Sequence, residues 1–224
     1  MFSIVIPIFN EARNIELLLK EINKSLENFK KYEIILVNDA STDGTLEVIN
    51  KINNKNIKII INKNNKGQSF SIFEGVKNSS FEIIITIDGD GQNDPADIPK
   101  LYNFYLQHND LKLVGGIRKN RKDSFTKILS SKIANYLRSK ILKDGCKDTG
   151  CSLKVFDKKI FLSFPFFNGL HRFLPALFRG YGYKTAFLEV NHRKRIYGSS
   201  KYGTMNRLFV GIRDIIKVKK ILKK

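Results

Sequence analysis

The first half of the chain alternates short apolar runs, rich in β-branched residues, with longer segments whose apolar residues recur every three or four positions. Short runs of this kind are typical of buried strands, and the longer spacing is typical of helices. The predicted strands are Phe2–Pro7, Tyr32–Val37, Ile57–Ile61, Phe81–Ile87 and Leu111–Gly115. The predicted helices are Asn10–Phe29, a segment from Ser41 or Thr42 to Asn53, Gln68–Lys77, and a segment from Asp94 to His108. This alternation predicts an α/β fold with a mostly parallel sheet flanked by helices.

The second half follows a less regular pattern. It predicts a long basic helix over Ser124–Leu142, strands over Leu153–Phe156 and Lys184–Asn191, and a helical region over Leu170–Gly180. No repeat and no Pro- or Gly-rich linker separates the halves, so we expect one domain with, at most, an appendage. That appendage is residues 204–224, whose apolar residues recur at helical spacing among Lys and Arg. Such a segment is typical of an amphipathic helix on a membrane surface, and packing against the rest of the chain is the alternative.

Composition narrows the partners and the compartment. The 224 residues include 40 Lys and Arg against 21 Asp and Glu, and the net charge of +19 predicts attraction to nucleic acid, a phosphorylated small molecule or an anionic membrane. Two cysteines, Cys146 and Cys151, are too few for a disulfide scaffold and favour a reducing cytoplasm. We expect no signal peptide at the strand-like start, and no apolar stretch approaches the ~20 residues that span a bilayer.

Two carboxylates and a carboxamide follow the strand Phe81–Ile87 directly. Asp88 and Asp90 are one residue apart, Gln92 adds an amide oxygen, and the glycines between them leave room for a ligand near the backbone. Hard oxygen ligands of this kind suit Mg²⁺ or Mn²⁺ bound together with substrate phosphates. A hairpin turn is the alternative for Asp-Gly pairs, and the continuous apolar run before them argues against it.

Acidic residues also follow two other predicted strands. Glu11 comes after the first strand and Asp39 after the second, and in a parallel sheet these ends converge with Asp88 on one crevice. Carboxylates there can accept hydrogen bonds from a ribose or a base, and neighbouring helix N-termini favour phosphate. Capping of a helix is the alternative for both Glu11 and Asp39. Three acidic strand ends together favour a nucleotide–metal site, and the lack of a Gly-x-Gly-x-x-Gly or Walker-type loop argues against dehydrogenases and kinases.

Seven segments of the chain, in order, match the motifs of one known family. They are Ser3–Glu11, Val37–Thr45, Asn65–Gln68, Ile87–Pro95, Gly116–Arg118, Asp148–Cys151 and Arg195–Tyr202. On these segments the chain resembles the family 2 glycosyltransferases with the GT-A fold, and within them the polyprenyl-phosphate sugar synthases of the dolichyl-phosphate mannose type. The resemblance implies a Rossmann-like catalytic domain over residues 1–203, with a nucleotide-sugar half over 1–116 and an acceptor half over 117–203.

The resemblance also implies roles for individual residues. Those expected to bind the nucleotide-sugar donor or the acceptor are Pro7, Glu11, Asp39, Asp88, Arg118, Lys132, Arg195 and Lys201. Those expected to bind the divalent metal, Mg²⁺ or Mn²⁺, are Asp90 and Gln92. Those expected to act in catalysis are Asp90, Asp148 and Arg195. Among these, Arg195 and Lys201 would neutralise the diphosphate leaving group, and Arg118 would hold the acceptor phosphate with help from Lys132.

The activity that the resemblance implies is inverting transfer of a sugar from UDP or GDP to an undecaprenyl or dolichyl phosphate. The residues fit this chemistry, because a metal and cationic side chains stabilise the charge that grows on the leaving diphosphate. A phosphate acceptor, whose second pKa is about 6, is already largely dianionic and needs cations rather than a base. A hydroxyl acceptor would need a base, and Asp148 is the candidate, with a turn-forming role as its alternative.

Two other functions stay open at the level of sequence. A family 2 enzyme acting on a glycan hydroxyl in cell-surface polysaccharide synthesis would depend on Asp148 and not on Arg118. A nucleic-acid-binding protein is suggested by net charge alone, and the lack of a nucleic-acid-binding motif argues against it. We expect a cytoplasmic enzyme, peripheral on the inner face of the membrane. Many members of the family continue into transmembrane helices where this chain ends. Three alternatives therefore stay open: the protein is a peripheral enzyme, it works with a separate membrane protein, or the sequence is truncated.

Overall fold

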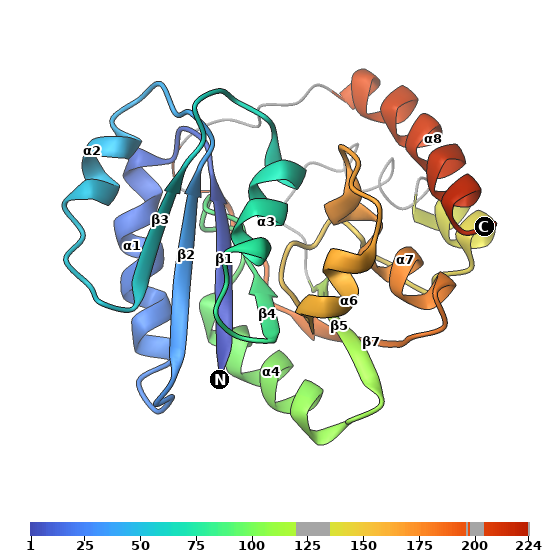
Figure 1. Ribbon diagram of the computed structural model, residues 1–224, viewed down its shortest axis with the longest axis horizontal. Helices are drawn as coiled ribbons and strands as arrows, with labels where there is room; N and C mark the ends of the chain where they lie inside the picture. The colour runs from blue at the N-terminus through green and yellow to red at the C-terminus, as the bar shows by residue number, and fades with distance from the viewer. Residues whose placement is uncertain (120–134, 196, 198–203, 224) are drawn as a thin grey trace.

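A mixed sheet organises the part of the chain that the computed structural model describes, which is residues 1–119, 135–195, 197 and 204–223 (Figure 1). Its seven strands lie in the order β3-β2-β1-β4-β6-β5-β7. They are β1 (Phe2–Ile8), β2 (Tyr32–Asn38), β3 (Ile57–Ile61), β4 (Ile83–Thr86), β5 (Leu111–Arg118), β6 (Lys154–Asp157) and β7 (Lys184–Val190). β6 pairs antiparallel with both of its neighbours, and the other pairs are parallel. The expected α/β fold with a mostly parallel sheet is therefore confirmed.

Helices cover both faces of this sheet. They are α1 (Ala12–Ser25), α2 (Thr45–Asn50), α3 (Gln68–Lys77), α4 (Ile98–Gln107), α6 (Lys158–Ser163), α7 (Leu174–Gly180) and α8 (Thr204–Ile221), with the 3-10 turns η1 (Pro95–Asp97) and η2 (Leu170–Arg172). Residues 135–142 are helical as well. Apolar side chains of α1, α2 and α4 pack in one hydrophobic cluster, and those of α3, α6, α7 and α8 pack in a second cluster.

Alternation along the central strand explains why both faces are buried. In β1, Ile4 and Ile6 belong to the cluster of α1 and α4, whereas Val5 between them belongs to the cluster of α3 and α7. All three side chains are fully buried. A strand that is covered on both faces has apolar residues at consecutive positions, as the sequence shows. In β1 and β4 the acidic residues therefore come only after the strand has ended.

The helix after β2 begins later than the sequence predicts. The expected cap was Ser41 or Thr42, yet α2 begins at Thr45 and no side-chain hydrogen bond caps it. The hydroxyl of Ser41 instead accepts from the Asn10 N–H at 2.9 Å, and the Thr42 N–H donates to Asn10 Oδ1 at 2.7 Å. The predicted cap is wrong because these two residues tie the loop after β2 to the loop after β1.

Differences in the second half concern helix ends and short elements. The predicted helix Ser124–Leu142 is helical over residues 135–142, and its earlier part lies outside the described residues. The predicted helical region at Leu170–Gly180 divides into η2 and α7, with Phe173 between them. The sequence did not predict α6, because its six residues hold too few turns to show helical periodicity.

The C-terminal helix α8 packs on the rest of the protein through one face. Val218 is buried there, and Asp214 accepts from the Arg172 guanidinium at 2.8 Å. Leu222, just after the helix, lies so close to Gly180 that a Cβ at that glycine would be 2.4 Å from Leu222 Cδ2. Packing, one of the two alternatives for this segment, is thus observed for the described side chains. Within the described ranges, no helix is long and apolar enough to cross a membrane.

Gly75, in the middle of α3, lets this helix lie directly on the sheet. A Cβ at Gly75 would be 2.4 Å from Val5 Cγ1 and 3.1 Å from Val37 Cγ2. We expect Gly75→Ala to lower the free energy of unfolding in urea by about 1–3 kcal/mol through overpacking. Gly211→Ala in α8 is the control, because no described atom lies within 4 Å of its Cβ position and Ala favours a helix over Gly. Unchanged stability of Gly75→Ala would contradict this close approach.

Candidate active site

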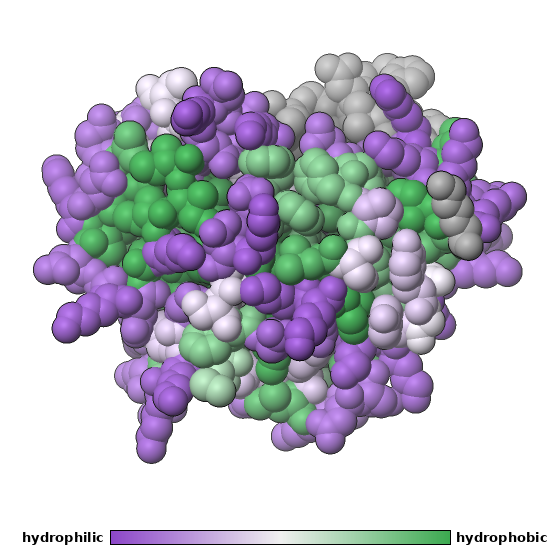
Figure 2. Space-filling view, viewed as in Figure 1, coloured by the Kyte–Doolittle hydropathy of each residue, from purple (hydrophilic) through white to green (hydrophobic). Residues whose placement is uncertain are grey.

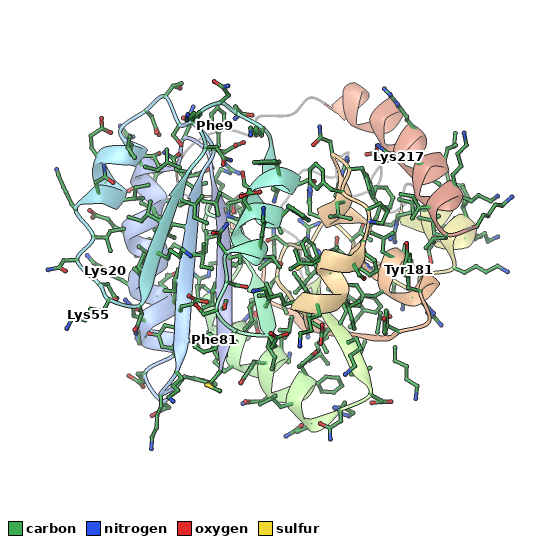
Figure 3. The ribbon with its side chains drawn as sticks, in the orientation of Figure 1. Phe9, Lys20, Lys55, Phe81, Tyr181 and Lys217 are labelled. Carbon is green, nitrogen blue, oxygen red and sulfur yellow. The ribbon has the colours of Figure 1, made fainter. Side chains whose placement is uncertain are left out.

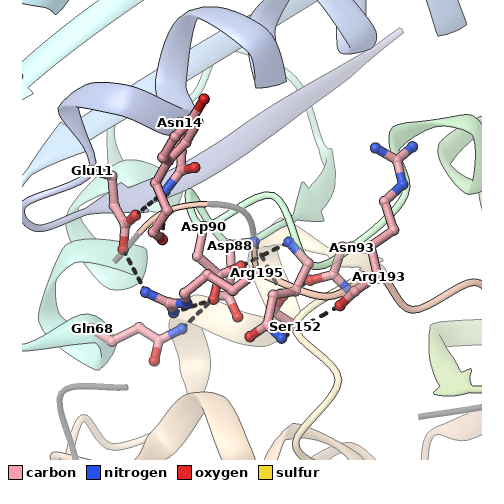
Figure 4. Close-up of polar contacts among 11 residues, drawn as sticks. Glu11, Asn14, Gln68, Asp88, Asp90, Asn93, Ser152, Arg193 and Arg195 are labelled. Atoms are coloured by element: carbon pink, nitrogen blue, oxygen red, sulfur yellow. Dashed lines mark hydrogen bonds and ion pairs between the residues drawn. The ribbon is translucent and has the colours of Figure 1, made fainter. Parts of the chain in front are cut away.

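The reversal of strand order beside β1 brings acidic residues together at one edge of the sheet. β2 and β3 lie on one side of β1 and β4 lies on the other, so the loops after β1 and β4 leave the same sheet edge. Glu11 is in the first loop, and Asp88 and Asp90 are in the second (Figure 4). Glu11 is 8% exposed and Asp90 is 9% exposed, while Asp88 is partly exposed. These carboxylates therefore share one largely desolvated edge.

Arg195 joins carboxylates from both loops. Its guanidinium donates from Nη2 to Asp90 Oδ2 at 2.5 Å and from Nη1 to Glu11 Oε1 at 3.3 Å (Figure 4). Asn14, in the first turn of α1, donates to the other Glu11 oxygen at 2.6 Å. Glu11 precedes α1, but its side chain makes no capping hydrogen bond. Helix capping, the alternative for this residue, is therefore not what its carboxylate does.

Asp88 has a different environment from Asp90. Its Oδ1 accepts from Gln68 Nε2 at 2.7 Å, and its N–H donates to Ser152 Oγ at 3.1 Å. Burial and the negative charge of Asp90 raise the pKa of Asp88 to about 7. Both effects disfavour the carboxylate form, so a cation bound beside Asp88 would stabilise its charge.

The loop from Asp90 to Gln92 is a tight turn that presents oxygen atoms. Asp90 Oδ1 accepts from the Gln92 N–H at 3.0 Å, and Gly91 between them has a φ of 71°, in the left-handed region that favours glycine. Among the described residues, no three His, Cys, Asp or Glu side chains gather as a metal site. The donors available are carboxylate and amide oxygens, and this chemistry fits Mg²⁺ or Mn²⁺ when substrate phosphates complete the coordination.

Arg193 fastens this turn to α1. Its N–H donates to the Gln92 carbonyl oxygen at 2.9 Å, and its Nη1 donates to both carboxylate oxygens of Glu21 at 2.8 Å. Its Nη2 pairs with Asp94. The sequence did not single out Arg193, although the matching motif begins two residues later. Because Arg193 fixes the backbone beside the acidic loop, it helps to bring Arg195 to the carboxylates.

Asp39 organises the loop that leads into α3. Its Oδ1 accepts from Asn62 Nδ2 at 2.7 Å and from the Lys66 N–H at 3.0 Å, and its Oδ2 accepts from the Gly67 N–H at 2.7 Å. The residue is 3% exposed. A carboxylate offers about four acceptor positions, so the described residues leave one for a ligand. The sequence left helix capping open as the alternative role of Asp39, but its carboxylate contacts the loop before α3 and not the start of α2.

Arg118 and Asp148 form a bidentate pair. Arg118 donates from Nε to Asp148 Oδ2 and from Nη2 to Asp148 Oδ1, both at 2.8 Å. The side chains are 14% and 6% exposed. The sequence predicted Arg118 as a phosphate ligand and Asp148 as a candidate base, and the structure brings the two together. Two charge-assisted hydrogen bonds from the guanidinium stabilise the ionised carboxylate, so this geometry disfavours the base role.

The remaining predicted residues differ in what the structure shows of them. Pro7 lies near the end of β1, and its carbonyl oxygen would be 3.3 Å from a Cβ at Gly89, so β1 and the acidic loop are in close contact. Lys132 and Lys201 lie outside the described residues.

A buried lysine that the sequence did not single out lies beneath the acidic edge. Lys154, in β6, is 4% exposed and donates to the carbonyl oxygens of Thr149, at 3.4 Å, and Cys151. Its positive charge opposes the rise in the pKa of Asp88. A single lysine in a short apolar run gives no periodic signal, and its burial depends on β6 pairing with strands on both sides.

Among solved structures, the chain shares its fold with sugar-phosphoglycerate synthases. The chain is similar to glucosyl-3-phosphoglycerate synthase from Mycobacterium tuberculosis, solved with Mn²⁺, UDP and phosphoglyceric acid, at a TM-score of 0.75 and 19% identity, covering 97% of this chain and 76% of that one. It is also similar to mannosyl-3-phosphoglycerate synthase from Rubrobacter xylanophilus, at a TM-score of 0.72 and 16% identity, covering 97% and 72% of the two chains. This likeness confirms the predicted GT-A class of fold.

Sequence comparison then gives the family. Residues 3–164 match the model of glycosyl transferase family 2, and the chain belongs to that family. It is 35% identical over 223 residues to dodecaprenyl-phosphate galacturonate synthase from Rhizobium johnstonii, covering 96% of this chain and 65% of the relative. It is 32% identical over 211 residues to undecaprenyl-phosphate 4-deoxy-4-formamido-L-arabinose transferase from Aeromonas hydrophila, covering 92% and 64%. The chain thus spans just under two thirds of the length of these relatives.

The pair of Arg118 and Asp148 can be tested by a double-mutant cycle. We expect Arg118→Met alone to destabilise the protein by about 3–5 kcal/mol, because it leaves the Asp148 charge buried without its partner. The double variant Arg118→Met/Asp148→Leu should recover a large part of that loss, measured as the free energy of unfolding in urea. If the destabilisation of the double variant equals the sum of those of Arg118→Met and Asp148→Leu, the pair does not stabilise the fold.

Proposed function

We propose that the protein is a metal-dependent, inverting glycosyltransferase that moves a sugar from a UDP- or GDP-linked donor to polyprenyl phosphate. The observation that carries the proposal is the acidic edge at the carboxyl ends of β1 and β4, where Arg195 bridges Glu11 and Asp90 beside Asp88. A cation among carboxylates at the carboxyl ends of parallel strands suits a substrate that brings both phosphates and a metal ion. The names of the two relatives, both sugar transferases to polyprenyl phosphates, support the acceptor class.

Donor binding in this proposal uses residues of several strand ends. Glu11 and Asp39 accept hydrogen bonds from the nucleoside, with Pro7 beside them, and Asp88 lies next to the ribose and phosphates. Asp90 and Gln92 hold Mg²⁺ or Mn²⁺, which supplies positive charge against the diphosphate when bound. The raised pKa of Asp88 supports this arrangement, because burial and the charge of Asp90 disfavour its carboxylate form and a bound cation would offset both effects.

Arg195 makes the chain's own contribution to the departure of the leaving group. In the proposed reaction an acceptor oxygen forms a bond to the anomeric carbon while the bond from that carbon to the diphosphate oxygen breaks, which inverts the anomeric centre. Arg195 exchanges a carboxylate contact for an oxygen of the diphosphate, on which negative charge increases. A cation at that position stabilises the transition state more than the ground state.

The acceptor separates the proposal from a second candidate function. A phosphate monoester, with a second pKa of about 6, needs cations to hold it and no base to deprotonate it. Arg118 is the cation in this proposal, and Asp148 keeps its guanidinium in place. Transfer to a glycan hydroxyl in cell-surface polysaccharide synthesis would instead need Asp148 as a free base, and its bidentate bonds to Arg118 favour the phosphate acceptor.

We further propose that the protein works at the inner face of the cytoplasmic membrane, alone or with a separate membrane protein. Figure 2 shows hydrophilic side chains along the right-hand edge of the molecule, over α8. The exposed residues of α8 include Arg213, Ile216, Lys217, Lys219 and Lys220. The helical residues 135–142 expose Tyr136, Leu137 and Ile141. Exposed aromatic and aliphatic side chains with lysines around them suit the interface of an anionic bilayer.

A product assay tests the donor, the acceptor and the metal together. The wild-type protein is incubated with Mn²⁺, undecaprenyl phosphate and each of UDP-glucose, UDP-galacturonic acid, UDP-N-acetylglucosamine and GDP-mannose, and lipid-linked sugar is measured. We expect one donor to give product and Asp90→Ala to abolish it. Asp110→Ala is the control, because this exposed aspartate pairs with Lys184 away from the site. Transfer to a glycan hydroxyl but never to the lipid would refute the acceptor, and full activity of Asp90→Ala would refute the metal role.

Binding to vesicles tests the membrane surface. We expect the protein to bind vesicles that contain anionic lipid, and Lys219→Glu/Lys220→Glu in α8 to weaken that binding at least tenfold, since each basic residue near the surface contributes about 1 kcal/mol. Lys51→Glu/Lys55→Glu is the matched control, because Figure 3 shows Lys55 at the end of the molecule opposite to Lys217 of α8. Equal losses in the two double variants would show that net charge matters and that α8 does not direct the contact.

A further inference from the structure

His171 and Ser69 form a polar pair that the transfer described above does not use. His171 lies in η2 and Ser69 in the first turn of α3, and the Ser69 Oγ is 2.6 Å from the His171 Nδ1. Gln68, the residue before Ser69, donates to Asp88 at 2.7 Å. Two consecutive residues of α3 therefore connect the histidine to the acidic loop.

The hydrogen bonds of Ser69 determine which nitrogen of His171 carries the ring proton. Ser69 is 4% exposed, and its Oγ already accepts from the Gly169 N–H at 2.8 Å. Its own hydroxyl proton needs an acceptor, and among the described contacts that acceptor is His171 Nδ1. Burial lowers the pKa of His171 to about 3, and the charges of Arg172 and Lys154 lower it as well. The ring is therefore neutral, with its proton on Nε2.

The Nε2–H group is the part of the ring that can meet a ligand. Nδ1 and Nε2 lie on opposite sides of the imidazole, so this N–H points away from Ser69. In the described part of the chain, the buried side-chain nitrogen and oxygen atoms that lack a partner are Arg138 Nε and Arg172 Nε. No described group bonds to the Nε2 atom of His171, and this atom is not among the buried atoms without a partner. It is therefore accessible to solvent, as expected for a residue that is only partly buried.

Lys154 lies between the two halves of the site, and its charge acts on His171. It lies in β6, which separates β4, the strand that leads to Asp88, from β5, the strand that ends at Arg118. The charge of Lys154 acts on both Asp88 and His171, and the partners of these two groups, Gln68 and Ser69, are consecutive in α3, so His171 lies near the acidic loop. In the proposed reaction the sugar occupies the space between the donor diphosphate and the acceptor phosphate. A neutral N–H donor there matches a sugar hydroxyl oxygen.

We propose that His171 recognises the transferred sugar as a neutral hydrogen-bond donor to one of its hydroxyl oxygens, and that Ser69 is the positioning residue that fixes the donor tautomer. This inference rests on the proposed function and names a contact to the sugar itself. The pair is not a nucleophile and its base, because Ser69 is buried and its oxygen is engaged by Gly169. Since the ring stays neutral, its contribution to sugar binding is constant between pH 5 and pH 8.

The contact to the sugar is tested by comparing two affinities in His171→Ala. Dissociation constants are measured with Mn²⁺ for the nucleotide-sugar that the wild-type protein uses in the donor panel above, and for its nucleoside diphosphate. We expect the variant to bind the nucleotide-sugar roughly threefold to tenfold more weakly, the value of one hydrogen bond, and the nucleoside diphosphate as the wild type does. His108→Ala is the control, since this exposed histidine stacks on Phe104 in α4.

Three results would overturn the inference. Equal losses for both ligands would show a structural role for His171, and no loss for either would show that it does not touch the sugar. In both cases wild-type transfer would leave the proposed function standing. A wild-type protein that transfers no sugar from any donor would remove the proposed function, and this inference with it.

The role of Ser69 is tested on the free protein by long-range ¹H–¹⁵N NMR of the histidine rings. We expect His171 of the wild type to be neutral with its proton on Nε2 from pH 5 to pH 8. Ser69→Ala should allow the other tautomer and weaken binding of the nucleotide-sugar, and Ser69→Thr, which keeps the hydroxyl, should restore both. A proton on Nδ1 in the wild type, or an unchanged tautomer in Ser69→Ala, would overturn the assignment.

Discussion

Mutual repulsion among carboxylates at one edge of the sheet is the constraint that the rest of the site satisfies. Glu11, Asp88 and Asp90 meet there because β1 and β4 are neighbours and both strands end at the same edge. The free-energy cost shows in Asp88, whose pKa is raised to about 7 by burial and by Asp90. Charge of one sign is stable in such a place only when cations neutralise it, and Arg195 neutralises two of the three groups directly.

The cations that meet this constraint come from the second half of the chain. Arg195 follows β7, and Lys154 belongs to β6, whereas the carboxylates follow β1 and β4. The first half of the chain therefore carries the acids, and the second half brings positive charge to them. This division explains why the two halves form one site: neither would be electrostatically stable with its charged groups buried alone. In the proposed reaction, the sugar lies where the two halves of the chain meet, over β6.

The sequence predicted the features that depend on local pattern. A continuous apolar run that ends near a carboxylate identifies a buried strand and its edge, which is why the positions of Glu11, Asp39, Asp88 and Asp90 after strands were predictable. The partners of these groups were not predictable, because Arg118 meets Asp148 across 30 positions and Ser69 meets His171 across 102. Ser41 shows the same limit: its local pattern indicates a helix cap, but Asn10, from another loop, takes its hydroxyl.

Binding of the donor diphosphate at this edge is tested by crystal structures with Mn²⁺ and either UDP or GDP, in which the anomalous signal of manganese locates the metal. We expect the metal to bind between Asp90 and the diphosphate of one nucleotide. We also expect Arg195 to give up its contact with Asp90 and to bond to the diphosphate. Manganese elsewhere in the molecule, or a nucleotide that binds while Arg195 remains paired with Asp90 and Glu11, would contradict the claim that this edge binds the donor diphosphate.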